Sequence, residues 1–94
     1  MDGAQSPWTN RPHRSRLYAM KINLVKQRFG ERLRELRQSA GFTQEELADA
    51  AELDRSYVGS VERGERNLSI ENVCRLAAAI RVSPADLFSW WGDK

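Results

Sequence analysis

The sequence predicts a single all-α domain, and three observations support this fold class. From residue 22 onward, apolar residues recur at spacings of three and four, the period of an amphipathic helix. Serine, threonine or aspartate precedes several of these apolar runs, as N-cap residues do. No stretch alternates apolar and polar residues as a strand would, and 94 residues suit one domain. We therefore expect five short helices and no sheet.

The first helix is expected to start near Ile22 and to end before Gly41. One apolar stripe runs along it, made of Val25, Phe29, Leu33 and Leu36. Gly41 is a natural terminator because glycine adopts the left-handed conformation common just after a helix.

A capping box marks the start of the second helix, expected over residues 44–51. The hydroxyl of Thr43 and the carboxylate of Glu46 would each accept a hydrogen bond from an otherwise unpaired backbone N–H. The third helix is expected to start at Arg55, with Asp54 as its N-cap, and to stop before Gly64. The connection between the two is so short that it allows only an angled helix pair.

Two further helices complete the predicted domain. Ser69 is the expected N-cap of the fourth, whose apolar residues are Ile70, Val73, Leu76, Ala77 and Ile80. Ser83 and Pro84 form the N-cap and first-turn pair expected at the start of the fifth, with Leu87, Phe88 and Trp91 as apolar contacts.

The composition excludes several classes of protein. The single cysteine, Cys74, cannot form an internal disulfide and is expected to be a buried thiol in a reducing compartment. No apolar run approaches the roughly 20 residues that cross a bilayer, so no membrane partner is expected. The first residues lack the order of a signal peptide. These observations predict a cytoplasmic protein.

Positive charge is concentrated in the first part of the chain. Residues 1–37 contain nine Lys or Arg against three Asp or Glu, whereas the whole chain carries only +2. This asymmetry favours a polyanionic partner on one side of the molecule. We expect residues 1–20 to be a flexible arm or leader, with Met20 as an alternative start, and residues 21–94 to form the domain. The alternative for Arg11, Arg14 and Arg16 is a basic arm that contacts phosphates.

The third predicted helix has one face without aliphatic residues. Five positions share it by helical spacing: Arg55, Ser56, Gly59, Ser60 and Arg63. Gly59 costs roughly 1 kcal/mol of helix stability relative to alanine, which is explained if a large partner approaches the backbone. The major groove of DNA, about 12 Å wide, admits such a helix. Residues 44–63 thus predict a helix-turn-helix.

These segments resemble the Cro and phage-repressor family of helix-turn-helix domains over residues 31–91. The matched positions are Gly41, Thr43-Gln44, Leu47-Ala48, Leu53, Val61-Glu62-Arg63-Gly64, Ser69, Leu76-Ala77 and Val82-Ser83. Within that family, the segment LDRSYVGSVERGERNLSIENV is most similar to the controller proteins of restriction–modification systems. Glu52 occupies a turn position where many relatives have glycine, and because a left-handed glutamate is strained, the turn is expected to be shaped slightly differently.

The resemblance implies roles for individual residues. Side chains expected to reach base edges are Arg55, Ser56 and Ser60, with Arg55 matching the two acceptors of guanine. Side chains expected near phosphates are Gln44, Tyr57, Arg63, Arg66, Asn67 and Arg37. Arg37 and Glu62 are expected to form an ion pair that orients the arginine.

The resemblance also implies assembly. We expect a homodimer that uses Leu87, Trp90 and Trp91 and places the two recognition helices about one DNA turn, roughly 34 Å, apart. The predicted operator is an inverted repeat, and two dimers could occupy adjacent sites to activate at low and repress at high concentration.

Alternative functions are an antitoxin that neutralises a toxin and represses its own gene, and a phage-type repressor. An enzyme is not expected, because one histidine, one cysteine and no paired carboxylates provide no catalytic set. No cofactor, metal ion or small-molecule effector is expected either. The sequence therefore predicts a DNA-binding transcriptional regulator.

Overall fold

The computed structural model describes the backbone of residues 12–90 and the side chains of residues 21–90. Its elements are four α-helices and a 3-10 helix: α1 (Pro12–Ser39), α2 (Gln44–Ala51), α3 (Arg55–Glu62), α4 (Ile70–Ala79) and η2 (Pro84–Phe88). No strand occurs between residues 12 and 90, which confirms the all-α prediction. Within this range no helix is long and apolar enough to cross a membrane.

The first helix is longer than predicted. It begins at Pro12 rather than near Ile22 and runs for 28 residues. Proline is tolerated in a first helical turn, and the following segment is rich in Arg, Leu, Ala, Met and Lys, which have high helix propensity. The predicted boundary at residue 20 therefore falls inside a helix. Residues 1–11, the rest of the predicted arm, lie outside the described residues.

The predicted fifth α-helix is a five-residue 3-10 helix instead. Its start is as expected: the Ser83 side chain accepts a hydrogen bond from the Asp86 N–H, and Pro84 occupies the first turn. The segment then ends in the turn at residues 89–90, which leaves too few residues for α-helical hydrogen bonds to accumulate.

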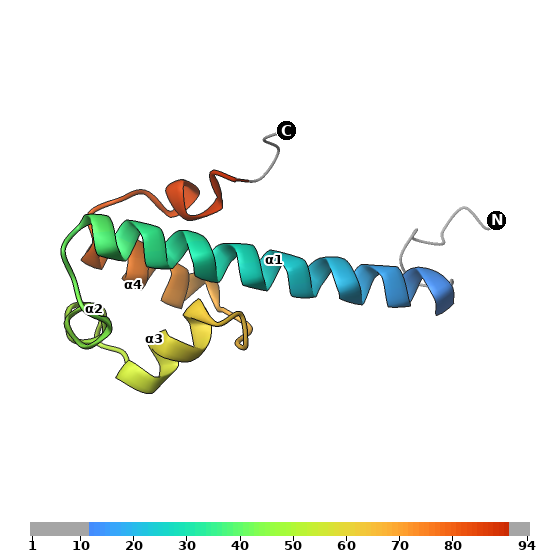
Figure 1. Ribbon diagram of the computed structural model, residues 1–94, viewed down its shortest axis with the longest axis horizontal. Helices are drawn as coiled ribbons and strands as arrows, with labels where there is room; N and C mark the ends of the chain where they lie inside the picture. Colours follow the sequence, from blue (N-terminus) through green and yellow to red (C-terminus); the bar gives the residue numbers. More distant parts are fainter. Residues whose placement is uncertain (1–11, 91–94) are drawn as a thin grey trace.

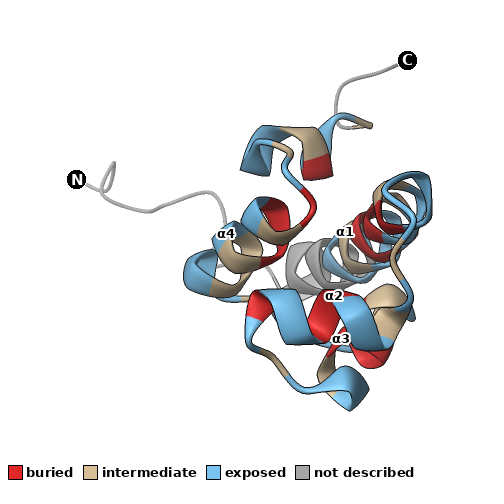
Figure 2. Cartoon of the chain, turned by 90° about the vertical axis from the view of Figure 1, so that its left-hand side faces the viewer, coloured by how far each residue is buried: buried red, intermediate tan, exposed pale blue. Residues whose placement is uncertain are grey.

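The elements pack in layers around one small core (Figures 1 and 2). Helices α1 and α4 lie in the middle, α2 and α3 cover one side, and η2 covers the other. The buried apolar residues lie where these layers meet: Phe29, Leu33, Leu47, Ala48, Ala51, Val58, Val61, Leu76, Ala77, Ile80 and Leu87. The N-terminal half of α1 projects beyond these layers, and Ile22 is accordingly 45% exposed.

A glycine fixes how closely α3 approaches α1. A Cβ atom at Gly30 would lie 2.5 Å from the carbonyl oxygens of Val61 and Glu62, which is closer than real Cβ atoms come. No side chain fits there, so the C-terminal end of α3 rests directly on α1. No local pattern in the sequence indicates this role of Gly30, because the close approach depends on how α3 packs.

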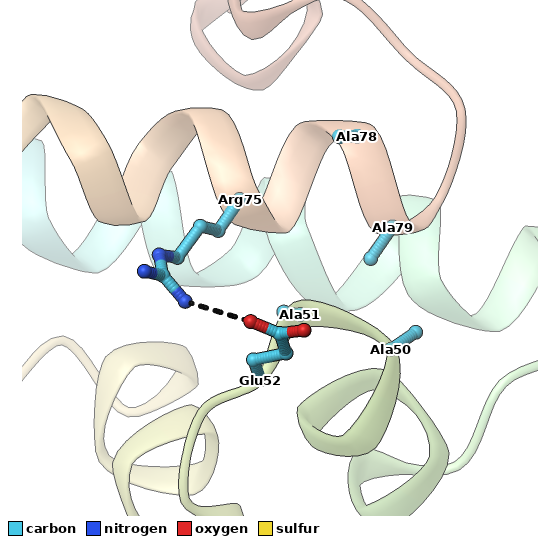
Figure 3. Close-up of a pocket in the computed structure, with 6 residues that line it drawn as sticks. All are labelled: Ala50, Ala51, Glu52, Arg75, Ala78 and Ala79. Carbon is cyan, nitrogen blue, oxygen red and sulfur yellow. Dashed lines mark hydrogen bonds and ion pairs between the residues drawn. The ribbon is translucent and has the colours of Figure 1, made fainter.

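The turn between α2 and α3 keeps the left-handed conformation that its glutamate was expected to disfavour. Glu52 has φ 60° and ends α2, and its carboxylate lies 3.5 Å from the Arg75 guanidinium on α4. The two side chains face each other beside a shallow pocket lined otherwise by alanines (Figure 3). On α4 itself, Cys74 is exposed, so the prediction of a buried thiol is wrong. Helical spacing leaves it off the face formed by the buried Leu76 and Ala77.

Candidate nucleic-acid interface

Helix α3 is held on the surface by its short apolar face. Val58 and Val61 are 0% and 2% exposed, and α3 contacts both α2 and α1. The capping box predicted for α2 is present in both directions, with 2.9 Å from the Thr43 N–H to the Glu46 carboxylate and 3.0 Å for the reverse bond. The capping box at the start of α2 and the apolar contacts of α3 with the core therefore hold the two helices in place.

The start of α3 differs from the prediction in one detail. Asp54 has the extended backbone of an N-cap residue, but its side chain accepts no hydrogen bond from α3. The side-chain cap expected of Asp54 is thus absent.

Arg55 and Ser56 occupy the first turn of α3, and both are exposed. Neither side chain forms a hydrogen bond or ion pair with another described residue. Two of the three predicted base-contacting residues therefore present free hydrogen-bonding groups to the outside.

The third, Ser60, does not lie on the outward face as predicted. It is only 6% exposed, and its hydroxyl donates to the Tyr57 carbonyl at 2.9 Å. The same oxygen accepts a hydrogen bond from Arg66 Nε, also at 2.9 Å. Helical spacing gives the direction of the Ser60 side chain around α3, but it does not predict that Arg66, in the loop after the helix, covers this side chain. Its hydroxyl is engaged within the protein and not available for a base.

Arg66 belongs to a small network that joins this loop to α3 and α4. Its guanidinium carbon lies 5.3 Å from the centre of the Tyr57 ring, in a cation–π arrangement. The Tyr57 hydroxyl accepts a hydrogen bond of 3.0 Å from Asn72 Nδ2. The Tyr57 hydroxyl keeps its own hydrogen for another acceptor, and the exposed Arg66 keeps its terminal nitrogens.

Gly59 is buried, and the space that its missing side chain leaves is filled by the protein itself. A Cβ atom there would lie 3.3 Å from a terminal nitrogen of Arg63 and 3.6 Å from Gln44 Oε1. The glycine therefore lets these two side chains lie across α3. Direct approach of DNA to the Gly59 backbone, as expected from the sequence, is not supported.

The predicted ion pair between Arg37 and Glu62 is confirmed. Arg37 Nε and a terminal nitrogen donate to the two Glu62 oxygens at 2.6 and 3.1 Å, and the other terminal nitrogen donates to the Phe42 carbonyl at 2.8 Å. Arg37 is 8% exposed, so its guanidinium is used inside the protein. The phosphate contact expected of Arg37 is therefore not available.

Gln44 joins the same network at the first residue of α2. Its Nε2 donates to Glu62 Oε1 at 3.0 Å, which fixes the side chain beside α3. The carboxylate of Glu62 thus links α1, α2 and α3 through three side chains.

Arg63 and Glu65 form an exposed ion pair at the end of α3. Two guanidinium nitrogens lie 3.1 and 3.2 Å from the two carboxylate oxygens. Hydrogen bonding to Arg63 lowers the pKa of Glu65, and the same bond raises the pKa of Arg63. Asn67, predicted to contact phosphate, is exposed in the loop that follows.

Sequence reasoning missed two residues of this surface, Glu65 and Asn72. The close spacing of Glu65 to Arg63 and Arg66 was an available signal. Asn72 could not be found from the sequence, because its contact with Tyr57 depends on how α4 packs beside α3.

The predicted dimer residues are only partly at the surface. Leu87 is 0% exposed and fills the core of its own protomer, so it cannot form an intermolecular contact. Trp90 is partly buried and packs against that core, and Trp91 lies outside the described residues. The neighbouring Phe88 is 37% exposed and contacts Phe29, with ring centroids 5.1 Å apart.

Within residues 21–90, no group of three or more His, Cys, Asp or Glu side chains is arranged to hold a metal ion. The arrangement suits hydrogen bonding and charge pairing with an external partner.

Comparison with known proteins agrees with this geometry. Residues 33–87 match the helix-turn-helix family. The chain is 36% identical over 69 residues to the control protein C.BamHI of Bacillus amyloliquefaciens, covering 72% of this chain and 85% of that protein. It is 38% identical over 69 residues to the control protein C.MunI of a Mycoplasma species, covering 72% and 93%. The fold is similar to the restriction–modification controller protein C.AhdI from Aeromonas hydrophila, with a TM-score of 0.65 and 55% identity over 66% of this chain and 94% of that chain.

Proposed function

The chain belongs to the helix-turn-helix family, and from this premise we propose that it is a sequence-specific DNA-binding transcriptional regulator of the restriction–modification controller type. The observation that carries the proposal is the exposed first turn of α3, where Arg55 and Ser56 have no partner among the described residues. A helix with a free polar first turn, supported by a second helix, can enter a major groove.

Base recognition is assigned to Arg55 and Ser56. A guanidinium presents two parallel N–H donors, which match O6 and N7 of guanine. Arg55 is therefore the residue proposed to select a guanine in each half-site. Ser56, one residue along, has a short hydroxyl that either donates or accepts, so it contributes less discrimination.

Contacts with the phosphate backbone of DNA are assigned to polar residues on α2, on α3 and in the loop after α3. They are Gln44, Tyr57, Arg63, Arg66 and Asn67. Gln44 is the first residue of α2, where the helix N-terminus favours an anion. The remaining four lie on α3 or in the loop after it, with Arg63 and Arg66 supplying charge. These contacts would fix register on the duplex without selecting sequence.

The proposed assembly is a homodimer on an inverted repeat. The predicted interface is revised to Phe88, Trp90 and Trp91, because Leu87 is buried within its own protomer. Support comes from Phe88, a large apolar side chain exposed at the end of η2. Two dimers on adjacent sites would allow activation at low and repression at high concentration.

Selection from random DNA tests the proposed function. The purified chain should enrich an inverted repeat whose half-site centres lie about one helical turn, roughly 34 Å, apart. Sedimentation at the concentrations used should show a dimer, and Phe88→Glu should shift it toward monomer. Enrichment of no sequence above the starting pool would contradict the function, and enrichment of a single asymmetric half-site would contradict the dimer alone.

A further inference from the structure

The buried Ser60 hydroxyl forms a second hydrogen bond besides the one within α3. Bonding to the Tyr57 carbonyl uses its only hydrogen, so its oxygen can serve only as an acceptor toward Arg66. That oxygen accepts from Arg66 Nε at 2.9 Å, across six residues and a turn at Gly64, where φ is +78°. The bond therefore joins the loop after α3 to the helix itself.

We propose that Ser60 is a positioning residue that holds the Arg66 guanidinium in place for a DNA phosphate before DNA arrives. This inference rests on the proposed function, because it concerns the same DNA-facing surface. Ser60 does not touch DNA in this account. Its effect is transmitted through Arg66.

The geometry around Arg66 restricts the guanidinium from two directions. Ser60 holds Nε at one edge, and the Tyr57 ring lies under the planar group at 5.3 Å. Tyr57 is in turn bonded to Asn72 at 3.0 Å, so the ring is fixed to α4 as well as to α3. Only the terminal nitrogens of Arg66 remain available, and they are the pair that binds a phosphate side by side.

Such prior ordering affects affinity because a free arginine loses rotational freedom when it binds. An exposed arginine has many rotamers, and immobilising it at an interface is unfavourable. A side chain already held in its bound orientation avoids most of that loss. Ser60→Ala should therefore weaken DNA binding although Ser60 itself makes no contact with DNA.

The test is a double-mutant cycle on the full chain and its selected operator. Ser60→Ala should lower affinity about three- to ten-fold, the loss expected for freeing one long side chain. In an Arg66→Ala background the same change should have almost no effect. Ser39→Ala is the matched control, because Ser39 is exposed at the C-terminal end of α1 and is assigned neither to DNA nor to the dimer, so it should leave affinity unchanged.

Two further measurements test the Ser60–Arg66 bond, the first of them in the free protein without DNA. The Arg66 Nε–H resonance in the free protein should be displaced from the unfolded position and should return to it in Ser60→Ala. Arg66→Lys retains the charge but has no Nε donor, so it should lower affinity as Ser60→Ala does, and the two changes together should not add.

The outcomes separate this proposal from the proposed function. Equal losses from Ser60→Ala with and without Arg66 would mean that Ser60 acts on α3 alone, which overturns the proposal. An unperturbed Arg66 Nε–H resonance in Ser60→Ala would overturn it too. Failure of the wild-type chain to prefer any DNA sequence would instead remove the function on which it rests.

Discussion

The two ends of α3 differ in how far their polar side chains are engaged within the protein. At the N-terminal end, Arg55 and Ser56 are exposed and make no hydrogen bond to another described residue. At the C-terminal end, Arg63 is paired with Glu65, and Arg66 is bonded to Ser60. The difference separates two tasks. Side chains proposed to contact bases are free to adapt, whereas Arg63 and Arg66, proposed to contact phosphates, are already engaged with other side chains.

Removing the Glu62 carboxylate should have the largest effect, because it joins the C-terminal end of α3 to α1 and α2. Glu62→Ala would leave the buried Arg37 guanidinium without its charge partner and release Gln44. The expected loss is about 3–5 kcal/mol in the free energy of unfolding, measured with urea. The control is Glu35→Ala, which breaks the exposed pair with Arg32 and should cost less than about 1 kcal/mol. Equal losses of unfolding free energy in Glu62→Ala and Glu35→Ala would show that the buried Arg37–Glu62 pair does not stabilise the packing of α3.

Replacing a side chain at the free end should change specificity. Arg55→Ala is expected to cost roughly 1–3 kcal/mol of discrimination at one position in each half-site, with stability unchanged. Titration of operator variants against the purified variant measures this. Arg66→Ala is the comparison, because loss of a phosphate contact should weaken all sequences alike and reduce the salt dependence. The contrast between the two ends would be refuted if both variants weakened every sequence equally.

The two helix glycines should respond in opposite directions to alanine. Gly59→Ala should raise stability by up to about 1 kcal/mol, because alanine favours the helix and the new Cβ makes ordinary contact with Gln44 and comes tighter than that only to the mobile end of Arg63, at 3.3 Å. Gly30→Ala, the control, should lower it by roughly 1–3 kcal/mol, since its Cβ would overlap backbone oxygens. Thermal unfolding measures both. Destabilisation by Gly59→Ala would show that Arg63 cannot move aside.

The smallest expected effect concerns the ion pair at the engaged end. Glu65→Gln should free Arg63 and strengthen binding to non-specific DNA about two-fold, because an exposed ion pair is weak. Acid should have the same effect in the wild type. Pairing with Arg63 lowers the pKa of Glu65. Acid should therefore release Arg63 from Glu65 only below the pH at which an unpaired glutamate takes up a proton. Glu45→Gln, an exposed change on α2, is the control for altered net charge. Unchanged non-specific affinity in Glu65→Gln would indicate that Arg63 does not contact phosphate.

Local signals in the sequence predicted the elements well, and the family resemblance supplied the Arg37–Glu62 pair. The capping box of α2 and the end of α3 before Gly64 follow from short-range rules. Ser60 was assigned wrongly because helical spacing gives the direction of a side chain but not what folds over it. Leu87 and Cys74 were misplaced for a related reason, since a buried face depends on which helices meet. Long-range packing determined each of these differences.

Methylation interference on the selected operator tests the central claim most directly, because N7-methylguanine blocks the acceptor that Arg55 is proposed to bind. The account predicts strong interference at one guanine in each half-site with the wild-type chain, and loss of that interference with Arg55→Ala. Identical interference patterns for the two proteins would contradict it, because recognition would then not depend on the free end of α3.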